Sequence, residues 1–391
     1  MKQIKVHSGI LLLLLIQVQF SAIGQDQGAK EALIEAFENY TELPREVVYE
    51  HTNKTTYIKG EQIGFTAYVF DKASKKLSGD TANLYVVLED QNTILKQQLL
   101  QVEEGIATSS FVVDSLLTKE TYTLKAYTNW MRNFQEQNAF EQCIRVLDPE
   151  KKNPLQIINS KVTAQFTPEG GSLVPGVENV VGVSIKDKDG LGIANIEGLI
   201  FDSNDKKITS FKVDELGYGR LLMTAEQGEN YYGRFRFNGE DLSFALPQVK
   251  EQGIAVRITG ENDKVIFSLQ TNEVAVSEKK DQEYTLVVHN GSKARIETLT
   301  KFGIAGMNKT FSRNELFPGV NIFTILNSEN QAVSERLYFN FNTLSVIKTQ
   351  NIEARRENDS IAISLVYPEG TVDANSSLSI SVLPSTTIAN T

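Results

Sequence analysis

The stretch GEQIGFTAYVFD, residues 60–71, has the period of a β-strand that ends in a turn. Its apolar residues recur at every second position: Ile63, Phe65, Ala67 and Val69. Because successive side chains of a strand point to opposite faces, this pattern puts an apolar row on one face. Similar stretches continue to about residue 148, separated by turn-forming Asp, Asn, Ser and Gly residues. Their number, roughly six or seven, predicts an antiparallel β-sandwich.

A second unit, from about residue 160 to 248, repeats the pattern. Gly176 precedes Asp187 by eleven residues, just as Gly60 precedes Asp71, and alternating apolar residues lie within each interval. An internal repeat explains this spacing, although two ordinary hairpins could converge on it. A third run of strands follows. We therefore predict an all-β chain of tandem immunoglobulin-like antiparallel β-sandwich domains.

The N-terminus has the layout of a secretory signal peptide. Lys2 and Lys5 precede the apolar run Gly9–Ile16, and Ala22 and Gly24 are small residues before an expected cut. The run is too short to cross about 30 Å of hydrocarbon, so we expect an exported chain with no transmembrane segment once it is mature.

A helical segment near the N-terminus and a short strand-like segment near the C-terminus define the remaining expected domain boundaries. Lys30–Tyr40 has helical periodicity and is ended by Pro44. The strand-like stretches after residue 346 are too few to bury a core of their own. We expect the chain to stop inside a domain there, or these strands to pack on the third sandwich. The predicted units are a signal peptide (1–24), a short helical leader (25–45), three β-sandwiches (46–150, 155–250 and 251–345) and an incomplete fourth β unit (346–391).

The charge balance argues against polyanionic partners. The formal net charge is −10, and removal of the two signal-peptide lysines gives 37 − 49 = −12. An acidic chain is repelled by phosphate backbones, so we expect no nucleic acid partner.

The reactive residues form no recognisable catalytic or metal-binding pattern. His51 and His289 remain after signal removal, and Cys143 is the only cysteine, so conventional zinc ligation would need carboxylates. A Cys143–His51 dyad is conceivable if their strands pair, but two unrelated structural residues are the simpler interpretation. Asp187–Gly190 starts like a calcium loop and lacks the later ligands. We expect no catalytic, cofactor-binding or metal-binding residue, and no enzyme activity.

One segment has the composition of a contact patch. The only tryptophan, Trp130, lies close to Arg132 and Phe134. Trp and Arg are typical interface anchors, so these three residues are the candidate interaction patch. The alternative is structural: Trp130 packs over the edge of the sandwich and Arg132 stacks on it.

Several of these stretches also resemble a known family. Residues 46–63 and 65–69 resemble the opening of an MG2-type, alpha-2-macroglobulin-like domain of Bacteroidetes-type bacteria, and Leu124–Phe134 resembles its closing strand. Phe166–Val174 is similar to the opening of the following domain. Phe317–Val320 and Ser334–Tyr338 are similar to the close of the third.

This resemblance implies macroglobulin-like sandwiches in a row, located in the periplasm or at the outer membrane. Longer relatives end in a plug-like domain similar to that of TonB-dependent receptors. The family carries no settled biochemical role. The modular repetition and the lack of a catalytic constellation favour binding or scaffolding of an envelope protein or polymer, of which an outer-membrane receptor is one candidate. A macroglobulin-type protease inhibitor is the alternative. Gly60-Glu61-Gln62 is not the thioester of such inhibitors, because no cysteine precedes it.

Overall fold

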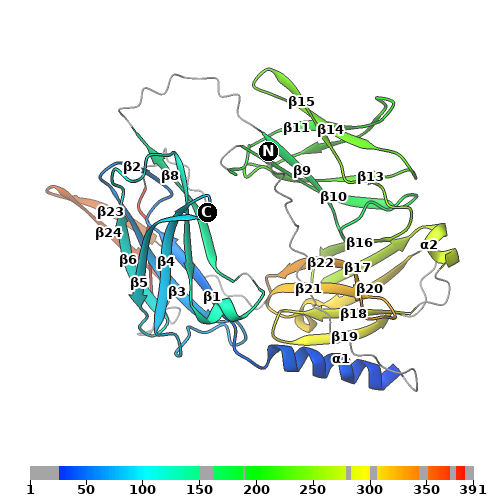
Figure 1. Cartoon of the computed structure of the whole chain (residues 1–391), viewed down its shortest axis with the longest axis horizontal. Helices are drawn as coiled ribbons and strands as arrows, with labels where there is room; N and C mark the ends of the chain where they lie inside the picture. Colours follow the sequence, from blue (N-terminus) through cyan, green and yellow to red (C-terminus); the bar gives the residue numbers. More distant parts are fainter. Residues whose placement is uncertain are drawn as a thin grey trace.

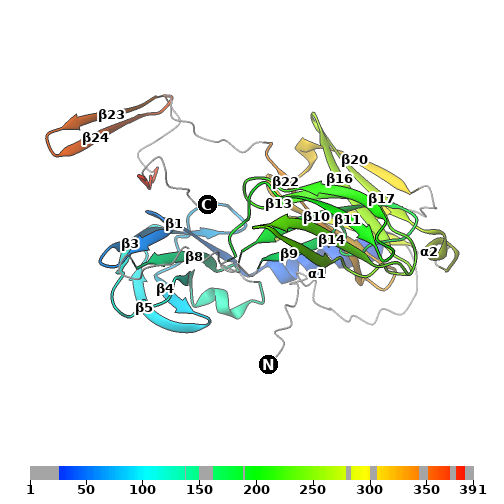
Figure 2. The ribbon, with the colours of Figure 1, turned by 90° about the horizontal axis from the view of Figure 1, so that it is seen from above.

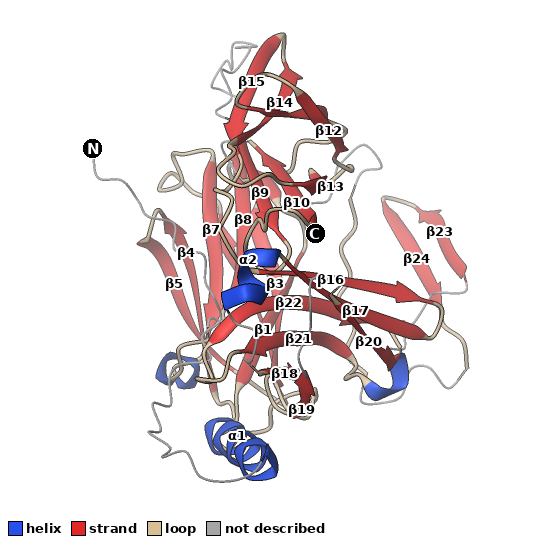
Figure 3. Ribbon diagram, turned by 90° about the vertical axis from the view of Figure 1, so that its right-hand side faces the viewer, coloured by secondary structure: helices blue, strands red, loops and turns tan. Residues whose placement is uncertain are grey.

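The computed structural model describes residues 26–136, 138–148, 162–187, 190–278, 283–299, 306–342, 351–369 and 376–383. The predicted signal peptide lies outside these residues. The described chain consists mainly of antiparallel β-sheets with few helices (Figure 3). The predicted all-β class of tandem antiparallel sandwiches is therefore confirmed.

Three sandwiches follow one another along the chain (Figure 1). In the first, one sheet contains β1 (Glu46–Thr52), β3 (Gln62–Asp71) and β6 (Ile106–Val112). The facing sheet has the order β2 (Thr56–Ile58), β8 (Phe140–Leu147), β7 (Thr121–Tyr127), β4 (Asn83–Asp90) and β5 (Thr93–Gln101). The short β2 pairs parallel with β8, an exception to the antiparallel prediction.

The second sandwich pairs β9 (Thr163–Pro168), β10 (Glu178–Lys186) and β13 (Tyr218–Thr224) in one sheet. Its other sheet has the order β12 (Lys207–Lys212), β11 (Glu197–Asp202), β14 (Tyr231–Phe237) and β15 (Glu240–Ala245). Apart from β2, this is the strand order of the first sandwich, so the repeat seen in the sequence extends to the topology.

The third sandwich has the same order again. One sheet contains β16 (Ile254–Glu261), β17 (Lys264–Thr271) and β20 (Met307–Ser312); the other contains β19 (Ala294–Leu299), β18 (Tyr284–His289), β21 (Gly319–Leu326) and β22 (Ala332–Asn340). A short helix, α2 (Glu273–Glu278), follows β17. In each sandwich the second strand lies at the centre of the three-stranded sheet: β3, β10 and β17.

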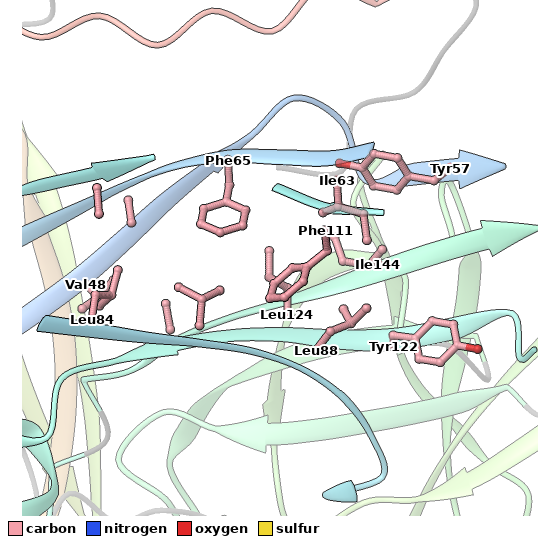
Figure 4. Close-up of a cluster of buried hydrophobic side chains, with 14 of the residues drawn as sticks. Val48, Tyr57, Ile63, Phe65, Leu84, Leu88, Phe111, Tyr122, Leu124 and Ile144 are labelled. Atoms are coloured by element: carbon pink, nitrogen blue, oxygen red, sulfur yellow. The ribbon is translucent and has the colours of Figure 1, made fainter. Parts of the chain in front are cut away.

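Each sandwich has its own apolar core, built from the alternating rows that the sequence shows. In the first, the row of β3 faces the row of the opposite sheet, and Ile63, Leu84 and Leu124 are fully buried (Figure 4). Full burial of one such side chain contributes about 1.5–3 kcal/mol, so a stretch that alternates in this way is strongly fixed in register.

Two turns have a matching construction that was not recognised in the sequence. The side-chain amide of Asn179 donates to the carbonyl of Val174 (2.8 Å) and accepts from its N–H (2.9 Å). Asn321 makes the same pair of bonds to Phe317, at 2.7 and 2.9 Å. A Pro-Gly pair lies between the partners each time, and its glycine has a positive φ that other residues rarely adopt.

The leader forms α1 (Asp26–Thr41), somewhat longer than the predicted Lys30–Tyr40. At the other end, β23 (Asn351–Glu357) and β24 (Ser360–Val366) pair as a separate hairpin. Residues 376–383 are not a strand, and two of their serines, Ser377 and Ser381, contact the first sandwich at Tyr68 and Asn53. The expectation that the last strands pack on the third sandwich is therefore wrong for this segment.

Candidate functional site

The leader helix joins the first and third sandwiches. The helix α1 packs along β19 of the third sandwich (Figure 1). It also contacts β18, where the Phe37 ring meets the His289 ring edge-on with centroids 5.4 Å apart. After Thr41 the chain passes directly into β1 of the first sandwich. A helix of this length is marginal in water, so its stability depends on these contacts.

His289 is the chemically unusual group in this junction. Its side chain is buried, and neither ring nitrogen has a hydrogen-bond partner among the described residues. Burial, followed by the positive charge of Lys72 from the first sandwich, lowers the pKa of His289 to about 4. The imidazole is therefore neutral at neutral pH and serves as a flat, largely apolar surface for Phe37.

Arg45 fixes the end of the leader to the first sandwich. Its guanidinium donates to the carbonyls of Leu43 (2.7 Å) and Tyr40 (2.8 Å). Its Nε lies 3.3 Å from Glu136 Oε1, and its Cζ lies 3.6 Å from the centroid of the Phe134 ring. With 7% exposure, Arg45 is a buried charge that is both paired and stacked.

The structure places the predicted patch at this same junction. Trp130 Nε1 donates to the carbonyl of Pro44 (2.9 Å), and its ring meets Phe134 at 5.3 Å. Trp130 keeps 38% of its surface exposed. Two of the three candidate residues therefore contact the leader of their own chain.

Arg132 takes no part in this arrangement. It is exposed, and within the described chain its guanidinium forms no ion pair and stacks on no aromatic ring. The structural alternative placed Arg132 on the aromatic ring, and this is wrong, because the stacked arginine is Arg45, on Phe134. No pattern in the sequence indicates this pairing, because almost ninety positions separate Arg45 from Phe134.

A second junction holds the second sandwich to the third. The backbone of Gly170 accepts a bond from Ser334 Oγ (3.1 Å), and Glu169 pairs with Arg336 at 2.8 Å. A methyl group on Gly170 would lie 2.7 Å from Ser334 Oγ, so only glycine permits this approach. The stretch Phe166–Val174, which resembles the opening of a domain, thus forms the interface between the second and the third sandwich.

An apolar strip remains uncovered on the third sandwich. Leu337 pairs with Ile322, and Ile322 with His289, so these three side chains form one row on the sheet face away from the core. α1 contacts the row at His289, whereas Leu337 is 51% exposed. The β21–β22 strip is the set of exposed residues at this end: Val320, Leu337, Phe339 and Phe341.

The strip has the chemistry of a contact surface. Phe341 is 70% exposed, and its ring lies 4.6 Å from that of Phe339. Val320 is directly opposite Phe339 across the strand pair. A row of exposed large apolar side chains on an edge strand is a frequent mark of an interaction site.

The His51–Cys143 dyad and the suspected calcium loop are the remaining candidate groups. His51 lies on β1 and Cys143 on β8, which belong to different sheets, so the strand pairing that a dyad required does not occur. Cys143 is half-buried. Asp187 Oδ1 accepts from the N–H of Leu191 (2.9 Å) in a turn, and residues 188–189 of the suspected calcium loop lie outside the described chain. No group of three or more His, Cys, Asp or Glu side chains in the described chain could hold a metal ion.

A surface hollow of about 530 Å³ lies at the turn before β6, lined by residues 103–104 and 106–108. All its lining residues come from one turn and the strand that follows.

No helix among the described residues is long and apolar enough to cross a membrane.

No family model and no curated protein matches the sequence. Among solved structures, the chain is similar to Salmonella alpha-2-macroglobulin reacted with methylamine, at 10% identity and a TM-score of 0.22, over 80% of this chain and 24% of that one. Dimeric latent PorU from Porphyromonas gingivalis matches at 11% identity and a TM-score of 0.31, over 75% and 34%. The Escherichia coli adhesin FdeC matches at 12% identity and 0.20, over 75% and 95%.

This chain thus spans about a quarter of the length of the alpha-2-macroglobulin it matches, at 24%. At these TM-scores the similarity supports no inference about activity or partner.

Proposed function

We propose that this chain is an exported, non-enzymatic protein of the bacterial envelope, with macroglobulin-like sandwiches that bind or scaffold a protein at the outer membrane. The observation that carries the proposal is the β21–β22 strip, an apolar surface beside the helical leader. The signal-peptide pattern and the family resemblance of the sequence support export and the envelope location.

The energetics favour a protein partner. Burial of a large apolar side chain from full exposure contributes about 1.5–3 kcal/mol, and the strip side chains are 42–70% exposed, so each would contribute roughly half of this amount. Aromatic residues often dominate the affinity of interfaces. Phe339 and Phe341 provide two adjacent rings for such a contact. A hydrated glycan would leave part of the apolar surface of these rings exposed to water, so a glycan is the less favoured ligand.

The test is site-specific photo-crosslinking in the intact envelope of the source organism. A photo-reactive residue replaces Phe339 (45% exposed), and the matched control carries it at Ile94 (48% exposed), on the edge strand β5. We expect one defined envelope protein to be captured from position 339 and not from position 94. The L337D/F339D variant, which makes the strip acidic, should lose the same partner in pull-down.

Three outcomes would count against the proposal. Equal capture from both positions would mean that the strip is not the site. Capture of proteases in cleaved form would favour the inhibitor alternative. Retention of a glycan by both the wild type and L337D/F339D would replace the protein partner with a polymer bound elsewhere.

A further inference from the structure

Three parts of the chain meet at His289, which lies at the end of β18 on the sheet face away from the core. The residue is only 6% exposed, and neither ring nitrogen has a hydrogen-bond partner among the described residues. The leader supplies Phe37, whose ring packs edge-on against the imidazole. The first sandwich supplies Lys72, which follows β3. Figure 2 shows α1 extending from the first sandwich to the third, so His289 lies where all three come together.

Lys72 packs directly against the turn that follows His289. A methyl group on Gly291 would lie 3.0 Å from Lys72 Cε and 3.2 Å from its Nζ. The Lys72 N–H donates to the carbonyl of Arg45 (2.7 Å), and Nζ lies 3.5 Å from Asn138 Oδ1. Because Arg45 also holds the end of the leader, the ammonium group is fixed at this junction while α1 is docked.

The charges around the imidazole are unbalanced. Lys72 is the charged group that acts on His289, and a positive charge there disfavours a second one. The neighbouring strands place the uncharged residues Ala294 and Ile322 opposite His289. The glutamates of α1 are exposed: Glu31, Glu35 and Glu38. The other charged groups at this junction act on Lys72: Glu136, Lys75 and Arg45. Among the described residues, a proton on His289 therefore meets a like charge and no hydrogen-bond acceptor.

The sheet face beneath α1 continues into the β21–β22 strip. His289, Ile322 and Leu337 form one row across β18, β21 and β22. The row is buried at His289 and Ile322, which are 6% and 7% exposed, but Leu337 is 51% exposed. Release of α1 would uncover the His289 end of this row, and the exposed apolar surface would become longer.

We propose that His289 and Lys72 form an acid-operated latch, in which protonation of His289 releases the leader helix from the third sandwich. While α1 is docked, the imidazolium is buried beside a like charge. After release, water solvates it and the distance to Lys72 increases. The effect of release on binding rests on the proposed function, because the uncovered row extends the strip, whereas the release itself does not.

The direction of the pH dependence follows from the two states of the ring. Burial and the charge of Lys72 hold the pKa of the docked His289 at about 4, and a released imidazole has the ordinary value of about 6.5. The released state therefore binds more protons between these values, so docking weakens as the pH falls from 6.5 to 4.

The experiment measures amide hydrogen exchange of residues 33–41 in the mature chain between pH 7 and pH 4, relative to an unstructured peptide at the same pH. We expect the protection of the helix to fall by about 100-fold as the pH decreases, while β3 and β18 stay protected. In H289F, which packs a ring that cannot be protonated, the helix should stay protected throughout. Protection of β3 and β18 at pH 7 shows that each variant is folded.

A second pair of variants tests the role of Lys72. K72M removes the like charge and keeps the length of the side chain, so the protection of the helix should fall by a smaller factor than in the wild type. K76M is the matched control, because Lys76 is an exposed lysine of the same turn. K76M should show the full fall.

Equal loss of helix protection in the wild type and H289F would overturn the proposal, because other acidic groups would then release the leader. Full protection of the wild-type helix down to pH 4 would overturn it as well. An equal fall in K72M and K76M would contradict the role of Lys72. No partner takes part in this measurement, so a failure to crosslink from position 339 leaves its result unaffected, and the reverse also holds.

Discussion

The two junctions of this molecule are built in different ways. The leader junction relies on charge and aromatic chemistry, with a stacked, buried Arg45 and a buried, neutral His289. The junction between the second and third sandwiches relies on close backbone approach, with Gly170 against Ser334 and an ion pair at the rim. The first should respond to pH and to loss of charge, and the second to the addition of a single methyl group.

The largest expected effect is at Arg45. R45A removes the stack on Phe134 and leaves Glu136 buried without its ion pair, so we expect a loss of about 3–5 kcal/mol in the free energy of unfolding. Urea denaturation of the mature chain, followed by Trp130 fluorescence, measures it. R132A is the matched control and should change stability by less than about 0.5 kcal/mol. Equal effects would show that the leader is not held at Arg45.

The second effect is a pH dependence centred on His289. The unfolded imidazole binds a proton below about 6.5, but the folded one only below about 4, so the unfolded state holds more protons between these values. The contribution of His289 to stability should therefore fall as the pH decreases from 6.5 to 4, by up to about 3 kcal/mol. The difference in the free energy of unfolding between the wild type and H289F, measured by denaturation at each pH, should show this fall.

Glu50 provides the opposite control. Burial raises its pKa to about 8, so the fold retains a proton that the unfolded chain loses near 4.5. Its contribution to stability should fall as the pH rises from about 4.5 to 8, and it therefore opposes the contribution of His289 between pH 4.5 and 6.5. E50Q should remove this dependence, including the loss of stability between pH 6.5 and 8, where His289 does not contribute. If H289F changes the profile between pH 6.5 and 8 instead, the assignment of the acid dependence to His289 is wrong.

A smaller effect is expected at Gly170. G170A brings a methyl group against Ser334 and should cost about 1–3 kcal/mol while loosening the second sandwich from the third. G171A is a matched control, because Gly171 also has a positive φ but nothing lies within 4 Å of an added methyl. The difference in the free energy of unfolding between G170A and G171A therefore measures the effect of the methyl group against Ser334. Small-angle scattering should show a longer particle only for G170A.

The smallest effect is expected at the rim of this second junction. Arg257 pairs with Glu178 at 2.8 Å, but the two side chains are 42% and 49% exposed. Exposed ion pairs contribute about 0–1 kcal/mol, so R257A should leave the melting temperature nearly unchanged. A loss as large as that of G170A would show that the junction depends on charge after all.

The sequence predicted the fold class because sandwich cores leave a clear period-two signal. The row from Ile63 to Val69 is buried as expected, and the spacing from Gly60 to Asp71 recurs in the second sandwich with the same topology. The Asn179 and Asn321 turns could also have been found, since both asparagines follow a Pro-Gly pair closely.

The junctions could not be predicted in the same way. The stack of Arg45 on Phe134 and the contact of Phe37 with His289 join residues that are distant in sequence, and a single chain carries no pattern for such pairs. The Trp130 segment was identified from its composition alone, which does not distinguish a partner surface from a contact within the chain. The β21–β22 strip was missed because its alternation looks like that of any half-buried strand.

The docking of the leader helix on the third sandwich is tested most directly by amide hydrogen exchange of residues 33–41 in the mature chain. An undocked helix of this length frays in water, so protection there reports the docking itself. We expect exchange at least about 100-fold slower than in an unstructured peptide, and loss of this protection in R45A while β18 stays protected. Free exchange of the helix in the wild-type chain, with β3 and β18 protected, would contradict the account.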